Sequence, residues 1–166
     1  MHLTIQNTDA SRGSAIVKDE QENKLFIIKG KKKSLSPTKK KFILDMSGNK
    51  LFKIRNRRLN FLFSGVILKD DQGNKMKLKT KLSFKKVCVL IGAGVDYKIT
   101  RNPEGHGFAI YKNEAIIATF NKFGSGSIND RYNIDYHNPA DLRMVLAIVA
   151  AFENIRDKDK QDISNV

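Results

Sequence analysis

Lysines occupy alternate positions in one short segment of the chain. Residues 75–82 read Lys-Met-Lys-Leu-Lys-Thr-Lys-Leu, and the cations are Lys75, Lys77, Lys79 and Lys81. In a β-strand successive side chains point to opposite faces, so these lysines would share one face, about 6.5–7 Å apart. Such a row could contact successive phosphates or lipid headgroups. The alternative is a solvated sheet exterior, where lysine also protects edge strands from aggregation.

Two further basic segments precede this one. Lys53, Arg55 and Arg57 alternate with Phe52 and Ile54 in the same manner. A loop around residues 34–37 is flanked by six lysines, which are Lys31, Lys32, Lys33, Lys39, Lys40 and Lys41. Near an anionic membrane each basic residue contributes about 1 kcal/mol. On nucleic acid each phosphate contact would steepen the salt dependence of binding. A solvated hairpin loop is the alternative for the six lysines.

The positive charge of the chain is concentrated in its first half. Among 166 residues, 31 Lys and Arg face 17 Asp and Glu, which gives a net charge of +14. Residues 1–86 hold 22 of these basic residues and 7 of the acidic ones, a net of +15. Such asymmetry favours a polyanionic partner, whether nucleic acid, anionic lipid or an acidic protein. The alternative is that the charge only keeps the protein dispersed.

No group of residues has the spacing of an active site, so we expect no catalytic residues, bound metal or cofactor. The single cysteine, Cys88, excludes an intrachain disulfide framework and a multi-thiolate zinc site. His2, His106 and His137 are far apart in the sequence. Gly92-Ala93-Gly94 lacks the third glycine and the helical context of a dinucleotide-binding fingerprint. The basic segments carry no accompanying row of aromatic residues, which weakens an interpretation as a single-strand nucleic-acid site.

A repeated hairpin pattern supplies the strands that must position the basic residues. Three segments with an Asp-x-x-Gly/Glu-Asn turn begin at Asp19, Asp45 and Asp70, offset by 26 and 25 residues. Asn, Asp and Gly tolerate the positive φ angles of hairpin turns, although such turn sequences are also common by chance. When the repeats are aligned, Lys53 falls at the position of Leu78, so a basic residue in one repeat matches an apolar residue in the other. The basic residues of both repeats can share one side of the sheet only if one repeat contains a bulge.

The remaining strands bring the expected total to about ten to twelve. Residues 1–14 are polar and predict a weak edge strand or a frayed end. Lys86 to Ile91 is nearly continuous in apolar residues and predicts a buried strand. Cys88, within this run, is expected to be buried.

The pattern changes to helical after Asn138-Pro139, which reads as an N-cap followed by proline at the first helical position. Residues 144–152 are nine apolar residues without a break, and we expect a helix over about 139–155. A helix that is apolar all round must be buried all round. The simplest arrangement is a closed or nearly closed β-barrel threaded by this helix. The rival is a helix packed between a sheet and a second subunit.

The chain resembles the LURP-one-related family, within the tubby C-terminal-like superfamily that also includes phospholipid scramblases. The resemblance covers about residues 15–155 and rests on the repeated hairpin turns, the segment 130–134, and Asp141-Leu142 opening the apolar helix. It implies a mainly β (α+β) fold, a twelve-stranded closed antiparallel barrel enclosing the C-terminal hydrophobic helix. We expect one domain over residues 1–156 and a charged, flexible tail over 157–166.

The resemblance also bears on function. Most members of the family have unknown functions, tubby-type barrels bind phosphoinositides, and scramblase relatives are attached to membranes. This chain has neither a cysteine cluster for acylation nor a C-terminal membrane helix, which argues against lipid scrambling.

We therefore expect a non-enzymatic barrel that binds anionic phospholipid headgroups at the cytoplasmic membrane face. The alternatives are a nucleic-acid-binding regulator, a structural or protein-interaction module without a ligand, and an enzyme or carrier with a pocket at the barrel mouth. The N-terminus has no charged-then-apolar leader, and no apolar run approaches the ~20 residues of a membrane span. The expected location is thus cytoplasmic or peripheral at the membrane.

Overall fold

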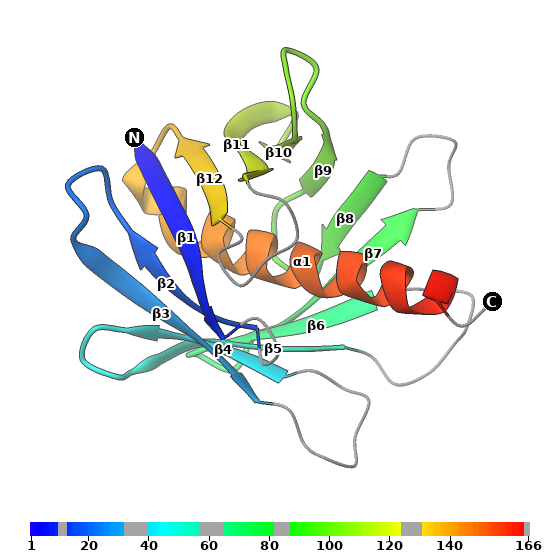
Figure 1. Cartoon of the computed structure of the whole chain (residues 1–166). Coiled ribbons are helices and arrows are strands. Elements are labelled where there is room, and N and C mark those ends of the chain that lie inside the picture. The colour runs from blue at the N-terminus through cyan, green and yellow to red at the C-terminus, as the bar shows by residue number, and fades with distance from the viewer. Residues whose placement is uncertain (10–12, 32–39, 57–64, 82–86, 124–130, 165–166) are drawn as a thin grey trace.

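The computed structural model describes residues 1–9, 13–31, 40–56, 65–81, 87–123 and 131–164. In these residues twelve antiparallel strands form a closed barrel around one long helix (Figure 1). The elements are β1 (His2–Asp9), β2 (Ser14–Lys18), β3 (Lys24–Lys31), β4 (Lys40–Asp45), β5 (Lys50–Asn56), β6 (Gly65–Asp70), β7 (Lys75–Lys81), β8 (Val87–Ile91), β9 (Tyr97–Arg101), β10 (Phe108–Lys112), β11 (Ala115–Phe123), β12 (Arg131–Tyr136), a 3-10 turn η1 (Pro139–Asp141) and α1 (Leu142–Ser164).

Each strand pairs with the next one in the chain, and β12 returns to pair with β1. This closure confirms the expected barrel. It also corrects the expectation for residues 1–14, because β1 is paired on both sides, with β2 and β12, and is not an edge strand. Leu3 and Ile5 point into the core, at 0% and 4% exposure, so two apolar residues suffice to hold an otherwise polar strand in the wall.

The three repeated turns are built alike, as the sequence predicted. In each, the aspartate carboxylate accepts the backbone N–H of the asparagine four residues later, at 2.7–2.8 Å, and also the asparagine side-chain N–H. The pairs are Asp19–Asn23, Asp45–Asn49 and Asp70–Asn74. The residue before the asparagine has a positive φ, 64° at Glu22, 86° at Gly48 and 92° at Gly73. Glycine adopts this region without steric strain, which explains its place in two of the three turns.

The register explains why the aligned basic residues appeared out of phase. An extra residue interrupts the pairing just after the turn in the first two hairpins, Leu25 in β3 and Leu51 in β5. The third hairpin pairs continuously. An extra residue moves every later side chain to the other face of the strand. Lys53 therefore points outward, although its counterpart Leu78 is buried in the barrel.

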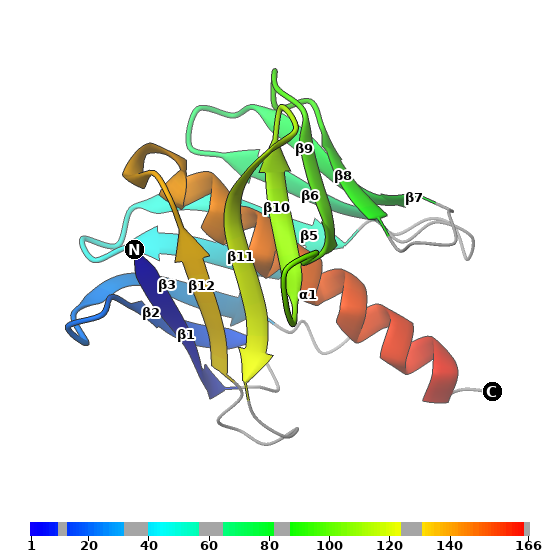
Figure 2. The same cartoon turned by 90° about the horizontal axis from the view of Figure 1, so that it is seen from above.

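The helix α1 threads the barrel and lies closest to β5 and β6 (Figure 2). Residues 145–151 are at most 2% exposed on every side of the helix, which confirms the enclosed helix. The Phe152 ring lies 4.7 Å from that of Phe108 and 5.5 Å from that of Phe120, between ring centres. This aromatic cluster fixes the helix against β10 and β11.

The sequence predicted the start of the helix correctly but not its end. Asn138 caps η1, because its side chain accepts the backbone N–H of Ala140 at 3.0 Å. Lys112 of β10 donates to Asp141 at 2.6 Å, which ties the start of the helix to the wall. The expected end near residue 155 is wrong, since α1 continues to Ser164, through the segment expected to be a tail. Lys, Arg and Gln in this stretch favour helical backbone even where the apolar run has stopped.

Candidate functional site

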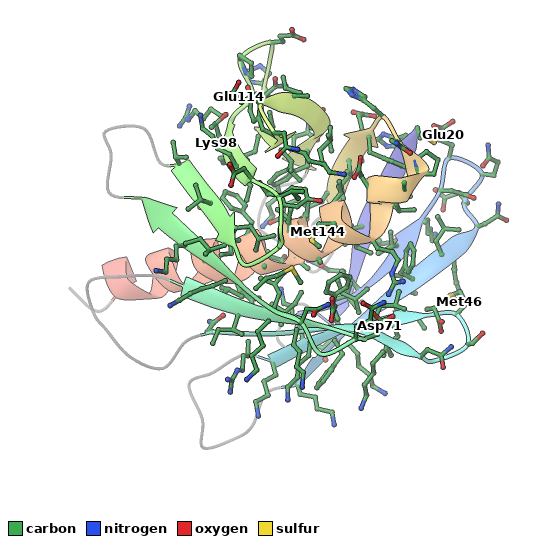
Figure 3. All side chains as sticks on the ribbon, turned by 180° about the vertical axis from the view of Figure 1, so that it is seen from behind. Glu20, Met46, Asp71, Lys98, Glu114 and Met144 are labelled. Atoms are coloured by element: carbon green, nitrogen blue, oxygen red, sulfur yellow. The ribbon has the colours of Figure 1, made fainter. Side chains whose placement is uncertain are left out.

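The outer wall of strands β3–β7 carries a group of nine cations, and we call it the basic face. In these strands most inward positions are apolar, as at Ile54, Leu68 and Leu78, all 0% exposed. The alternate positions point outward, and Figure 3 shows nitrogen-tipped side chains standing away from the outer side of these strands. The cations of the basic face are Lys29, Lys31, Lys40, Lys53, Arg55, Lys69, Lys75, Lys77 and Lys79.

Strand register arranges six of these cations in two rows that run across the strands. In one row Lys31 pairs with Lys40, which pairs with Arg55. In the other, Lys53 pairs with Lys69, which pairs with Lys75. Directly opposed residues have Cβ atoms about 4.5–5.5 Å apart, and like charges at that separation destabilise a sheet. The basic face is therefore a concentration of positive charge.

An aromatic ring lies within the basic face. Phe42 of β4 is paired with Lys29 on one side and Lys53 on the other. The Lys31 and Lys50 ammonium nitrogens lie 5.8 Å and 5.3 Å from the centre of its ring. A ring face attracts cations, so Phe42 helps to hold these lysines close together.

Carboxylates of β3–β7 are confined to the turn end, at Asp45 and Asp70, the last residues of β4 and β6. Asp45 is engaged by Asn49, whose side-chain hydrogen bond holds the pKa of that carboxyl below its ordinary value. In the adjoining turn Asp71 accepts from Arg143 of α1 at 2.7 Å, and this contact lowers the Asp71 pKa. The acidic groups thus remain at the turn end, away from the middle of the basic face.

A comparison with known families identifies the fold. The family model described as LURP-one-related matches residues 1–153. The chain belongs to the LURP-one-related family. No curated protein and no solved structure is matched by the chain.

In this LURP-one-related barrel seven of the basic residues that the sequence singled out lie on the basic face. They are Lys31, Lys40, Lys53, Arg55, Lys75, Lys77 and Lys79. Lys81 is the last residue of β7. Four others, Lys32, Lys33, Lys39 and Arg57, lie outside the described residues. Lys29 and Lys69 also lie on the basic face but were not predicted from the sequence, although the spacing of two between Lys29 and Lys31 was a usable signal.

Lys41 does not belong to the basic face, which corrects the sequence interpretation. It is adjacent to Lys40 and therefore points to the opposite side of β4, into the barrel, where it is 0% exposed. Its ammonium group donates to Glu153 of α1 at 2.5 Å. Lys41 is thus a structural residue that joins the helix to the wall.

Three further features of the described residues concern metal binding, the cysteine and membrane-spanning helices. Within it, no three His, Cys, Asp or Glu side chains gather as metal ligands. Cys88 is buried at 3% exposure, as its sequence context predicted. Among the same residues, no helix has the length and apolar character needed to cross a bilayer.

Proposed function

We propose that this LURP-one-related barrel binds anionic phospholipid headgroups through its basic face, at the cytoplasmic side of a membrane and without catalysing a reaction. The observation that carries the proposal is the pair of like-charged rows, Lys31–Lys40–Arg55 and Lys53–Lys69–Lys75. Directly opposed cations repel one another. A surface that carries many phosphates would offset that repulsion on binding, so the rows of cations fit a role in binding such a surface.

The size of the electrostatic attraction is adequate for membrane binding. Each basic residue near an anionic membrane surface contributes about 1 kcal/mol, within a Debye length of about 8 Å at physiological salt. Only part of a curved barrel wall can approach a flat bilayer that closely. Even four or five of the nine cations would then contribute about 4–5 kcal/mol.

Two features favour lipid over nucleic acid. Single-stranded nucleic acid is usually held by several stacking aromatics, whereas Phe42 is the one aromatic at an outward strand position of the described basic face. Its ring is also occupied by lysine ammonium groups. In addition, the resemblance to tubby-type barrels, which bind phosphoinositides, supports a lipid ligand.

Co-sedimentation with vesicles tests the proposal. The protein is expected to pellet with vesicles containing phosphatidylserine or phosphoinositide, to remain in solution with phosphatidylcholine alone, and to be released by high salt. Equal binding to both vesicle types, or binding to neither, contradicts it. A gel shift with DNA or RNA at physiological salt, together with no binding to anionic vesicles, would favour the nucleic-acid alternative.

A further inference from the structure

The outer side of β8 is apolar, which is unusual for the outside of a barrel. The sequence predicted a buried strand here, and this is wrong for the outer side of β8. Cys88 and Leu90 point inward at 3% and 4% exposure, whereas Ile91 is 50% exposed on the outside. Val87 and Val89, on the same outer side, are partly exposed. We call Val87, Val89 and Ile91 the apolar strip.

Cations bracket the apolar strip on both neighbouring strands. On β7, Lys77 is paired with Ile91 and Lys79 with Val89. On β9, Lys98 is paired with Val89 from the other side. Since Lys77 and Lys79 belong to the basic face, the apolar strip is a direct continuation of it.

Two residues of the apolar strip, Val89 and Ile91, also line a surface groove of about 970 Å³ between the β8–β9 connection and β10. Val95 and Tyr111 add apolar surface to the groove, and the Lys98 ammonium nitrogen lies 5.8 Å from the centre of the Tyr111 ring. Asp96 and Glu114 line the groove at its turn end. The groove therefore has a mixed lining, with apolar side chains, Lys98 and two carboxylates at one end.

The β8–β9 connection is anchored where it leaves the apolar strip. Gly92 has a φ of 92°, and a Cβ atom there would lie 2.9 Å from the carbonyl oxygen of Lys75. Only glycine fits such a close approach at this backbone angle. The connection is thus packed against the start of β7, which fixes Ile91 beside the basic face.

We propose that the apolar strip contacts the acyl-chain boundary of the membrane to which the basic face binds. The inference rests on the proposed function and adds an apolar component to it. An exposed apolar surface bracketed by lysines matches the layered chemistry of a bilayer, in which anionic headgroups surround an apolar interior. Because Asp96 and Glu114 line the groove, the apolar strip would reach the acyl chains and the turn end of the groove would not.

Tryptophan fluorescence can test this contact directly, because the chain contains no tryptophan. Ile91→Trp places the single reporter in the apolar strip. Met46→Trp is the matched control, since Met46 is 51% exposed but lies in the β4–β5 turn. With anionic vesicles the Ile91→Trp emission is expected to shift to the blue and to be quenched by lipids brominated on their acyl chains, while the Met46→Trp emission stays unchanged.

The outcomes separate this inference from the proposed function. Co-sedimentation of Ile91→Trp with anionic vesicles but without a blue shift or quenching overturns the inference and leaves headgroup binding intact. No co-sedimentation of either variant or of the unmodified protein overturns both. A blue shift that depends on protein concentration without vesicles shows that a second copy covers the strip, and this too overturns the inference. Ile91→Asn gives a second reading, with vesicle affinity expected to fall about tenfold and the unfolding temperature little changed.

Discussion

Lys40 and Lys41 are neighbours in the sequence, yet their ammonium groups lie on opposite sides of the barrel wall. Lys40 joins the row of cations on the basic face, whereas Lys41 is enclosed and bound to Glu153. A buried ammonium group is stable only while its partner and hydrogen bonds are in place. The two lysines therefore predict opposite responses to mutation, one in membrane binding and the other in stability.

Glu153→Gln is expected to lower the free energy of unfolding by about 3 kcal/mol, because Lys41 would remain buried without a counter-charge. The double variant Lys41→Met/Glu153→Leu is expected to recover most of that loss, since it removes both charges and fills the space. Urea unfolding followed by circular dichroism measures the free energy of unfolding of the single and the double variant. Asp71→Asn, which breaks the exposed pair with Arg143, serves as the control and should have a much smaller effect. A double variant as unstable as Glu153→Gln alone would contradict this account.

The repeated turns and the helix are the elements that the sequence predicted best. Asp-x-x-Gly-Asn has one strongly favoured local structure. Nine consecutive apolar residues leave their stretch of the helix without a polar side that could face water. What the sequence could not predict depends on partners distant in the chain. The bulges at Leu25 and Leu51 are defined by pairing with other strands, and so is the open outer side of β8. The inward direction of Lys41 follows from the same pairing.

The turns also predict a dependence of stability on pH. The Asn49 side chain holds the folded-state pKa of Asp45 below its unfolded value of about 3.8. The contact therefore stabilises the protein fully above that value, and its contribution is lost as the pH falls through the folded pKa. Asn49→Ala should lower the unfolding temperature at pH 7 and lessen its decline below about pH 4. Ser47→Ala, in the same turn, is the control, and an unchanged pH profile in Asn49→Ala would count against this role.

At the scale of the whole molecule, the charge differs from strand to strand around the barrel and from one end of the barrel to the other. The basic face covers β3–β7, the apolar strip adjoins it on β8, and the carboxylates of Asp19, Asp45, Asp70 and Asp71 lie in turns at one end of the barrel. A closed barrel with an enclosed helix is rigid, so these surfaces keep a fixed relation to one another. The arrangement predicts one preferred orientation on an anionic membrane, with the basic face toward the headgroups and the acidic turns directed away.

Two charge-matched double variants test whether the location of the charge, and not its amount, determines binding. Lys53→Gln/Lys69→Gln removes two opposed cations from the basic face, and Arg101→Gln/Lys122→Gln removes two from β9 and β11. Both lower the net charge equally. The first should also unfold at a higher temperature than the unmodified protein, because it relieves repulsion between directly paired lysines.

The most direct measurement is the affinity of these two variants for vesicles containing phosphatidylserine at physiological salt. The account predicts that Lys53→Gln/Lys69→Gln binds roughly 30-fold more weakly than the unmodified protein, at about 1 kcal/mol per residue, while Arg101→Gln/Lys122→Gln binds nearly as well. Equal losses in the two variants would show that net charge alone attracts the protein, and would contradict a binding site on β3–β7.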